Sequence, residues 1–339
     1  MTSTTDIRGN LPRIGPYQLS GRVLLSPMAG ITDAPFRKLA RQFGAALAAS
    51  EMTTADTGLW QTAKSRHRLD IDTDAEPRVV QIAGSEPGQL AEAAVAVVER
   101  GAQIVDINMG CPAKKVCRKL AGSALLQDED LVRGILQAVV RAVDVPVTLK
   151  TRLGWDPQHE NILRIGCIAQ DAGVQAIAIH GRTRACRYRG KARHGLIGDV
   201  KRMLDIPVFA NGDINCASMA RNVLDDTGAD GLLIGRATQG RPWILREISR
   251  FVATGQLAAP LSKSKTHAII RDHLDDLHAF YGEQKGVLMA KKHLNWYCHQ
   301  LQVADKTRRR LLACHEVSEQ REMARQLFNG RAGVRSLAA

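Results

Sequence analysis

Eight short apolar runs, each separated from the next by a helical segment, constrain the fold of this chain more than any other feature. The runs are apolar at most positions and do not alternate with polar residues, as is typical of strands buried on both faces. Amphipathic segments such as 89–100 and 130–143 lie between them. The runs are residues 23–26, 46–49, 79–82, 104–107, 147–150, 176–179, 208–210 and 231–234.

Eight strand–helix units within roughly 240 residues predict an α/β fold of the (β/α)8 kind, a TIM barrel. The alternative is a doubly wound open sheet. That alternative lacks a GxGxxG turn after its first strand, which counts against a classical dinucleotide-binding domain.

The pattern changes to helical after the eighth unit, and from about Pro242 onward there are no strand candidates. Residues 258–261 are typical of a linker. We therefore expect a barrel over residues 12–243 and a small C-terminal helical bundle over residues 244–330. Its basic faces, Lys291–Lys292 and Arg308–Arg310, are either solvated helix faces or RNA contacts. The expected helices are residues 247–257, 265–281, 289–299, 306–315 and 318–328.

The composition indicates which partners and which cellular compartment suit the protein. There are 47 Lys and Arg against 34 Asp and Glu, a net charge of +13, which suits either a nucleic-acid partner or a generally basic enzyme. The seven Cys contain no CxxC pair, which disfavours a zinc site and suits a reducing compartment. The polar N-terminus and the lack of a long apolar stretch predict a cytoplasmic enzyme without a metal or a membrane span.

Polar or glycine residues lie within or directly after the carboxyl-terminal half of each of the eight apolar runs. The carboxyl ends of barrel strands meet at one mouth, and buried polar groups are costly without partners, so this set predicts a ligand site. The groups are Ser26–Gly30, Ser50–Met52, Gln81, Asn108 with Cys111, Lys150 with Arg152, His180–Arg182, Asn211–Asp213 and Gly235–Arg236.

The identity of the ligand follows from the chemistry of these groups. Asn211–Asp213 and Gly235–Arg236 follow the seventh and eighth strands, the usual phosphate corner of barrels. Lys150 and His180 suit an electron-rich ring, and Pro27–Ala29 offer backbone groups and a thioether to its edge. One phosphate and one flat ring indicate FMN.

Asn108-Met-Gly-Cys-Pro112 places the Cys111 thiol on a loop at the end of the fourth strand. Four cations follow at once: Lys114, Lys115, Arg118 and Lys119. A thiol with a pKa of ~8.5 is mostly protonated at neutral pH and suits an acid, whereas nearby lysines favour the thiolate. Cys111 therefore suits either a proton donor or a nucleophile.

Several ordered motifs resemble those of the tRNA-dihydrouridine synthases, over roughly residues 12–328. The run Cys111-Pro-Ala-Lys-Lys-Val116 with Gly240-Arg-Pro-Trp-Ile244 is most similar to the bacterial B-type enzymes. Cys117 departs from the polar, non-thiol residue expected at its position. The other motifs are 26–37, 81–85, 106–112, 121–126, 180–184, 210–214 and 234–237.

The resemblance implies a flavin enzyme that reduces the C5–C6 double bond of uridine in the D-loop of tRNA. NADPH or NADH would reduce FMN, whose hydride would go to C6 while Cys111 protonates C5. We expect a monomer without an obligate protein partner. The implied FMN contacts are Pro27, Met28, Ala29, Gln81, Lys150, His180, Asn211, Gly212, Asp213, Gly235 and Arg236.

Contacts to tRNA are expected from a second set of residues near the mouth. For each basic member the alternative role is an ordinary surface salt bridge. The set is Asn108, Arg37, Lys114, Lys115, Arg152, Arg182 and Arg184.

Two other functions compete with this one. The first is an FMN barrel acting on a free pyrimidine, as in dihydroorotate dehydrogenases, and the basic cluster and helical tail disfavour it. The second is a non-catalytic RNA-binding protein that kept the barrel, which Cys111, Lys150 and the phosphate-corner glycines disfavour.

Overall fold

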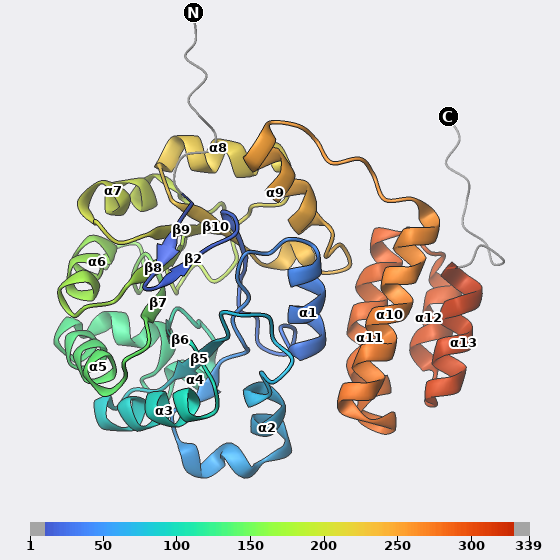
Figure 1. The fold of residues 1–339 in the computed structure, drawn as a ribbon, viewed down its shortest axis with the longest axis horizontal. Coiled ribbons are helices and arrows are strands. Elements are labelled where there is room, and N and C mark those ends of the chain that lie inside the picture. The colour runs from blue at the N-terminus through green and yellow to red at the C-terminus, as the bar shows by residue number, and fades with distance from the viewer. Residues whose placement is uncertain (1–10, 329–339) are drawn as a thin grey trace, which may run out of the picture. The chain divides into compact units, whose positions relative to one another are not determined.

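The computed structural model describes residues 11–328, which form two compact units (Figure 1). The first unit runs through Gly235 and includes Leu245–Leu257, and the second comprises Arg236–Ile244 and the chain from Ala258. This division differs from the expected one at residue 243, because helix α9 (Ile244–Thr254) lies almost wholly in the first unit. Its Ser249 hydroxyl donates to the carbonyl of Gly44 at 3.2 Å.

Eight parallel strands form one sheet, which confirms the predicted (β/α)8 barrel. Their order is β3-β10-β9-β8-β7-β6-β5-β4. Seven of the eight predicted runs are strands of this sheet, and the other is residues 46–49. The strands are β3 (Val23–Leu25), β4 (Thr53–Thr54), β5 (Val79–Ala83), β6 (Ile104–Met109), β7 (Val147–Arg152), β8 (Ala176–His180), β9 (Val208–Asn211) and β10 (Gly231–Ile234).

The run predicted as a strand at residues 46–49 closes the ring through isolated bridges. Ala48 bridges to Leu25 of β3, and Ala49 bridges to Val79 of β5, both in parallel. The amide of Ser50 also donates to the carbonyl of Val79 at 3.0 Å. With a single bridging residue on each side there is no continuous ladder, so this run is not a regular strand although it occupies the second strand's place.

Helices α3, α5, α6, α7 and α8 surround the strands (Figure 1). Helix α5 illustrates why they form: Asp128 caps its first turn by accepting from the amide of Leu131, and its apolar residues recur at helical spacing. The helices are α1 (Ala34–Gln42), α2 (Ala63–Leu69), α3 (Pro87–Glu99), α4 (Lys114–Cys117), α5 (Glu129–Ala142), α6 (Ile162–Asp171), α7 (Gly195–Met203) and α8 (Ala217–Thr227), with 3-10 turns η1 (Thr57–Gln61), η2 (Gly122–Gln127) and η3 (Arg236–Thr238).

A small hairpin covers the amino end of the barrel. It consists of β1 (Arg13–Ile14) and β2 (Tyr17–Gln18), which pair antiparallel. Ile14 and Leu19 are buried in one core cluster with strand residues such as Val79 and Ile104. The hairpin therefore closes the end of the barrel opposite the carboxyl ends of the strands.

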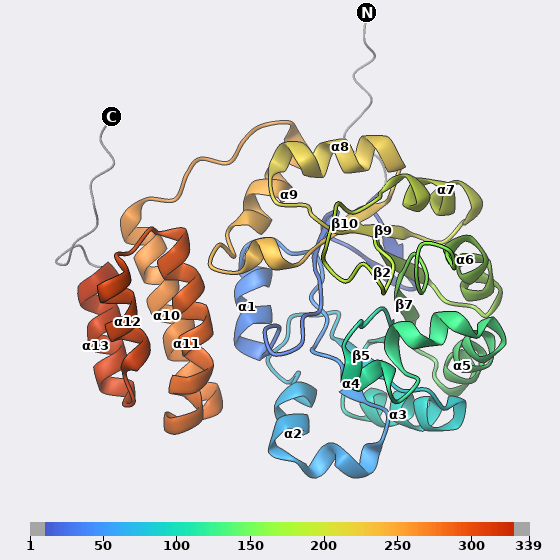
Figure 2. The same ribbon diagram turned by 180° about the vertical axis from the view of Figure 1, so that it is seen from behind.

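The second unit contains four of the predicted helices (Figure 2). Apolar residues such as Ile270, Leu277 and Leu294 form its interior, where the Tyr297 hydroxyl also lies 2.9 Å from Nδ1 of His273. No helix within residues 11–328 has the length and apolar content needed to cross a bilayer. The helices are α10 (Lys263–Tyr281), α11 (Glu283–Gln300), α12 (Asp305–Ala313) and α13 (Val317–Phe328).

Candidate functional site

The register of the central strands aligns several of the expected site residues at the mouth. Asn108 on β6 pairs with Lys150 on β7, and Arg152, two residues further on, pairs with His180 on β8. His180 in turn pairs with Asn211 on β9. The carboxyl ends of four consecutive strands therefore present neighbouring polar side chains, as the sequence predicts.

Asn211 links the side chains of Lys150 and His180. Its Oδ1 accepts from the Lys150 ammonium at 3.3 Å and lies 2.8 Å from Nδ1 of His180, while its amide nitrogen donates to the carbonyl of Leu233. His180 Nδ1 must therefore carry the proton, which leaves Nε2 to accept from Arg182 at 3.3 Å. Asn211 thus fixes both the tautomer and the position of the imidazole.

Burial keeps this histidine neutral. Burial, followed by the charges of Arg152 and Lys150, lowers the pKa of His180 to about 2. Burial, followed by the charge of Arg152, lowers the pKa of Lys150 to about 8. At pH 7 the site therefore holds a neutral imidazole beside an ammonium group that loses its proton more easily than an ordinary lysine.

The ends of the first and last strands meet at the expected phosphate corner. The amide of Ser26 donates to the carbonyl of Ile234 at 2.9 Å. A Cβ added to Gly235 would lie 3.7 Å from Sδ of Met28. Pro27 and Met28 are partly buried and Ala29 is exposed. Arg236 is exposed, begins η3 and is the first residue of the second unit, so its role toward FMN stays a prediction.

Gly212 and Asp213 both have positive φ angles, +123° and +54°. The Asp213 carboxylate accepts from Arg182 at 2.5 Å and from the amide of Ala192 at 2.8 Å. This carboxylate is therefore occupied within the protein, and backbone N–H groups, rather than the Asp213 side chain, suit an anion here.

Hydrogen bonds hold the Cys111 loop on both sides. Asn108 Oδ1 accepts from the amides of Gly110 and Cys111 at 3.2 and 3.0 Å. The Cys111 carbonyl accepts from the amide and the hydroxyl of Ser123 at 3.1 and 2.8 Å. Arg152 Nε donates to the Gly110 carbonyl at 2.7 Å. The thiol is thus presented by a fixed backbone, as an acid or a nucleophile requires.

The protonation state of Cys111 depends on burial more than on the adjacent lysines. Burial raises the pKa of its thiol and the neighbouring Cys117 adds to the rise, against smaller opposing effects of the Ala113 amide, Arg152 and Lys150. Since the raising effect is larger, the structure favours the protonated thiol at neutral pH. The competition between acid and thiolate that the sequence leaves open is thereby shifted toward the acid.

Three arginines expected to contact tRNA are buried and bonded within the protein. Arg37 is 1% exposed, pairs with Asp74 at 2.7 Å and donates to the carbonyl of Thr32. Arg152 and Arg182 are each 3% exposed. Their guanidinium groups bond to backbone carbonyls, and Arg182 also to Asp213. These guanidinium groups position loops and offer almost no surface to a phosphate.

Other expected RNA contacts are more accessible. Lys114 and Lys115 are exposed on the short helix α4, directly after the Cys111 loop. Arg184 is partly exposed, with its guanidinium 4.2 Å from the ring centroid of Trp155. These three cationic side chains are accessible to a polyanion.

Gln81 is fully occupied by neighbouring side chains. Its Nε2 donates to Asp106 at 2.6 Å, and its Oε1 accepts from Asn108 at 2.8 Å. Asp106 also accepts from the Thr148 hydroxyl at 2.7 Å. Sequence reasoning missed Asp106, Thr148 and Ser123, although a carboxylate inside the apolar run Ile104–Ile107 was a usable signal.

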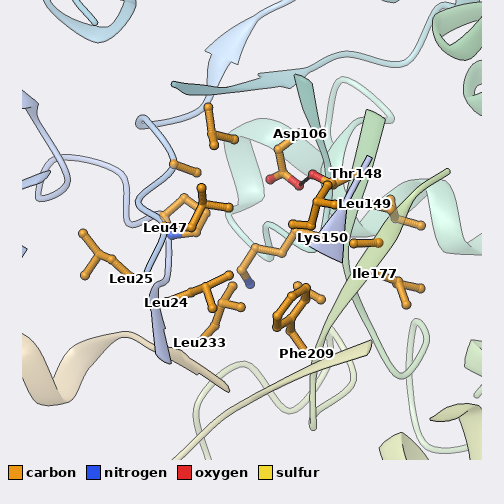
Figure 3. Close-up of a pocket in the computed structure, with 16 residues that line it drawn as sticks. Leu24, Leu25, Leu47, Asp106, Thr148, Leu149, Lys150, Ile177, Phe209 and Leu233 are labelled. Atoms are coloured by element: carbon orange, nitrogen blue, oxygen red, sulfur yellow. Dashed lines mark hydrogen bonds between the residues drawn. The ribbon is translucent and has the colours of Figure 1, made fainter. Parts of the chain in front are cut away.

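A cavity inside the barrel holds the Lys150 side chain (Figure 3). Its empty space is about 420 Å3, part of it open to solvent, and its walls are largely apolar, with Leu24, Phe209 and Leu233 near Lys150. No carboxylate among residues 11–328 forms an ion pair with Lys150. The lining of this cavity includes Lys150 but not His180, Asn211, Gly212 or Gly235. By their chemistry, the buried ammonium group, the neutral imidazole and the glycines at the strand ends suit the ring and the phosphate of a flavin.

The fold and this site define a (β/α)8 barrel with a polar site at the carboxyl ends of its strands, and sequence comparison identifies its family. The family model for dihydrouridine synthase (Dus) matches residues 24–332. The chain belongs to the dihydrouridine synthase family, which comprises flavin-dependent oxidoreductases.

Its relatives include bacterial proteins named tRNA-dihydrouridine synthase B. The chain is 54% identical over 318 residues to the one from Pseudomonas aeruginosa, which covers 93% of this chain and 95% of that protein. It is 52% identical over 316 residues to the one from Escherichia coli, covering 93% and 98%. A solved variant of NCR from Zymomonas mobilis shares the fold, with a TM-score of 0.50, 16% identity and coverage of 74% and 92%.

Proposed function

We propose that this protein reduces the C5–C6 double bond of a uridine in the D-loop of tRNA, with FMN as cofactor and NADPH or NADH as transient reductant. The protonated, rigidly held thiol of Cys111, within electrostatic reach of the Lys150 ammonium group, is the observation that carries the proposal. Its relatives are named for the formation of dihydrouridine in tRNA. The cytoplasmic, monomeric state expected from the sequence stays part of this proposal.

The chemistry that FMN would supply when bound is hydride transfer to the uracil. Lys150, His180 and Asn211 would hold its ring, and the backbone at Gly212 and Gly235 would hold its phosphate. A cation near the ring favours negative charge there, and the neutral imidazole adds hydrogen bonding without further positive charge. Gln81 enters only through its effect on Asn108, since both ends of its amide are occupied.

Cys111 supplies the proton. The Sγ–H of Cys111 would protonate C5, and the acid form persists at neutral pH because burial raises the pKa of this thiol. Asn108, Ser123 and Arg152 bond the backbone on both sides of the thiol, so that its direction of approach is set before the substrate binds.

The substrate base must leave its RNA stack to enter the barrel mouth. The exposed Lys114 and Lys115 lie directly after the Cys111 loop and suit the phosphates that flank an extruded nucleotide. We assign the collective RNA contact to these lysines and Arg184, and not to Arg37, Arg152 or Arg182, whose side chains are buried.

The salt dependence of tRNA binding tests this assignment. In the double variant Lys114→Ala, Lys115→Ala, the slope of log affinity against log salt concentration should decrease by about 0.7–0.9 for each lost phosphate contact. The matched control is Arg141→Ala, Arg202→Ala, because both arginines are exposed in the last turns of α5 and α7, on the side of the barrel away from the mouth. An equal slope in the two variants would contradict the assignment.

Mapping dihydrouridine in tRNA tests the function itself. Cells that lack this protein should lose dihydrouridine at one or more D-loop positions, and return of the gene should restore it. Purified protein should reduce tRNA far faster than free uridine. Equal rates on both would favour an enzyme of free pyrimidines, and a purified protein without absorbance near ~450 nm would favour an RNA-binding protein without catalysis.

A further inference from the structure

Three buried polar side chains connect the barrel interior to the Cys111 loop. Gln81 Nε2 donates to Asp106 Oδ2 at 2.6 Å, and Asn108 Nδ2 donates to Gln81 Oε1 at 2.8 Å. Asn108 Oδ1 then accepts from the Cys111 amide at 3.0 Å. Asp106, Gln81 and Asn108 are 7%, 1% and 8% exposed, so water does not replace these bonds easily.

The two ends of this chain of hydrogen bonds fix its direction. An ionised carboxylate only accepts, and a backbone N–H only donates. Gln81 and Asn108 must therefore each turn the NH2 group toward Asp106 and the oxygen toward the loop. The other orientation of either amide would set acceptor against acceptor at one end and donor against donor at the other, which costs about 1–3 kcal/mol for each buried group left unpaired.

Asp106 is mostly ionised at neutral pH. Burial raises the pKa of its carboxyl to about 6, against the lowering effects of the hydrogen bonds from Thr148 and Gln81 and of the charge of Lys150. The groups that face it are thus a hydroxyl donor on β7, an amide donor on β5 and one cation on β7. All three favour an acceptor at this position.

We propose that Asp106 is a positioning residue for Cys111: its carboxylate orients the Gln81 amide, which orients the Asn108 amide, which holds the backbone N–H groups of the loop that carries the thiol. Only the chemical role of the thiol rests on the proposed function. The hydrogen-bond chain itself exists in the folded protein without a substrate.

Two substitutions at Asp106 separate hydrogen-bond direction from charge. Asp106→Leu removes the acceptor of Gln81. Asp106→Asn removes the charge but keeps an acceptor for Gln81, because the new amide oxygen accepts from it. The new amide nitrogen donates to the Thr148 hydroxyl, whose oxygen can accept as well as donate. The readout is the rate at which iodoacetamide modifies Cys111 in the purified protein as a function of pH, followed on the Cys111 peptide by mass spectrometry with the Cys167 peptide as internal reference.

We expect Asp106→Leu to react about three- to tenfold faster at Cys111 at pH 8, with the rate profile shifted to lower pH. A loosened loop exposes the thiol, and one unit of thiol pKa changes the thiolate fraction about tenfold. Asp106→Asn should recover most of the wild-type rate. The charged or titratable groups that face Cys111, namely Lys150 and Arg152 on β7 and Cys117 on α4, are unchanged in both variants.

An unchanged pH profile of Cys111 modification in a folded Asp106→Leu protein would overturn the proposal. Equal changes of the modification rate in Asp106→Leu and Asp106→Asn would also overturn it, because Asp106 would then act through its charge. If Asp106→Leu does not fold, Gln81→Leu breaks the same chain one bond nearer the loop and should give the same faster modification. The assay measures no uridine reduction. A failure of the proposed function would therefore appear in tRNA analysis alone, and a failure of the positioning role in thiol reactivity alone.

Discussion

In the Cys111→Ala variant, single-turnover reduction of tRNA by the pre-reduced protein falls about 10²–10⁴-fold, the usual contribution of a positioned general acid. The methyl group has no proton to give to C5, and the hydrogen bonds that hold the loop are made by the backbone of residue 111, not by its side chain. The measurement is rapid-quench formation of dihydrouridine, with flavin absorbance as evidence that the cofactor is retained.

Cys167→Ala is the matched control, because Cys167 is another partly buried free thiol that lies on the outer helix α6. This control should reduce tRNA at the wild-type rate. An undiminished rate in Cys111→Ala would remove the acid role from the mechanism.

The pH dependence of the wild-type single-turnover rate separates the two roles of the thiol. Burial raises the pKa of Cys111, so its acid form persists to higher pH than in a free cysteine, for which the pKa is ~8.5. An acid therefore gives a rate that stays level through neutral pH and falls only as the pH rises through the raised pKa. A nucleophilic thiolate gives the reverse trend, a rate that rises with pH.

The Arg152→Met variant should be destabilised by at least about 3 kcal/mol, with a melting temperature lower by about 6–12 °C. Arg152 is buried and donates to the carbonyls of Gly110, Thr183 and Arg187 at 2.7, 3.1 and 3.0 Å. Methionine has similar length but leaves these carbonyls without their donor. The same change frees both the Cys111 loop and the loop after β8, so activity should fall even at temperatures where the protein is folded.

Arg164→Met is the matched control, because the Arg164 side chain is 69% exposed and pairs with Glu129 at the surface. Its melting temperature should stay close to that of the wild type. Arg152→Lys should recover little of the lost stability, since an ammonium group does not reproduce the planar fork that reaches three carbonyls. Equal stability of Arg152→Met and Arg164→Met in thermal denaturation would contradict the role given to Arg152.

The barrel was predictable because buried parallel strands have an unmistakable pattern. Runs such as residues 176–179 and 231–234 are apolar at every position, and the structure has strands there. The β1–β2 hairpin was not predictable, because two-residue strands show no periodicity. The helical pattern of α9 likewise does not show whether it packs in the barrel unit or in the helical unit, because that depends on tertiary contacts.

The position of the site was predictable from the sequence, but the hydrogen-bond and ion-pair partners of its individual residues were not. Chain order alone places Lys150, His180 and Asn211 at adjacent strand ends. The residue type of Arg37 or Arg182 shows a charge but does not show whether that charge faces solvent or a buried carboxylate. The partners of Gln81 also lie 25 and 27 positions away in the chain, beyond any local pattern.

Among residues 11–328, the hairpin that carries Ile14 closes the amino end of the barrel, which leaves the mouth at the carboxyl ends of the strands as the entrance. A nicotinamide and an extruded nucleotide that enter through the same mouth cannot occupy it together. In the proposed reaction, reduction of the cofactor and reduction of the uridine must therefore take place one after the other. Product RNA that leaves slowly would then block the next reductant as effectively as an inhibitor. The overall turnover rate would then depend on how fast substrates enter and products leave through the mouth as much as on the chemical steps.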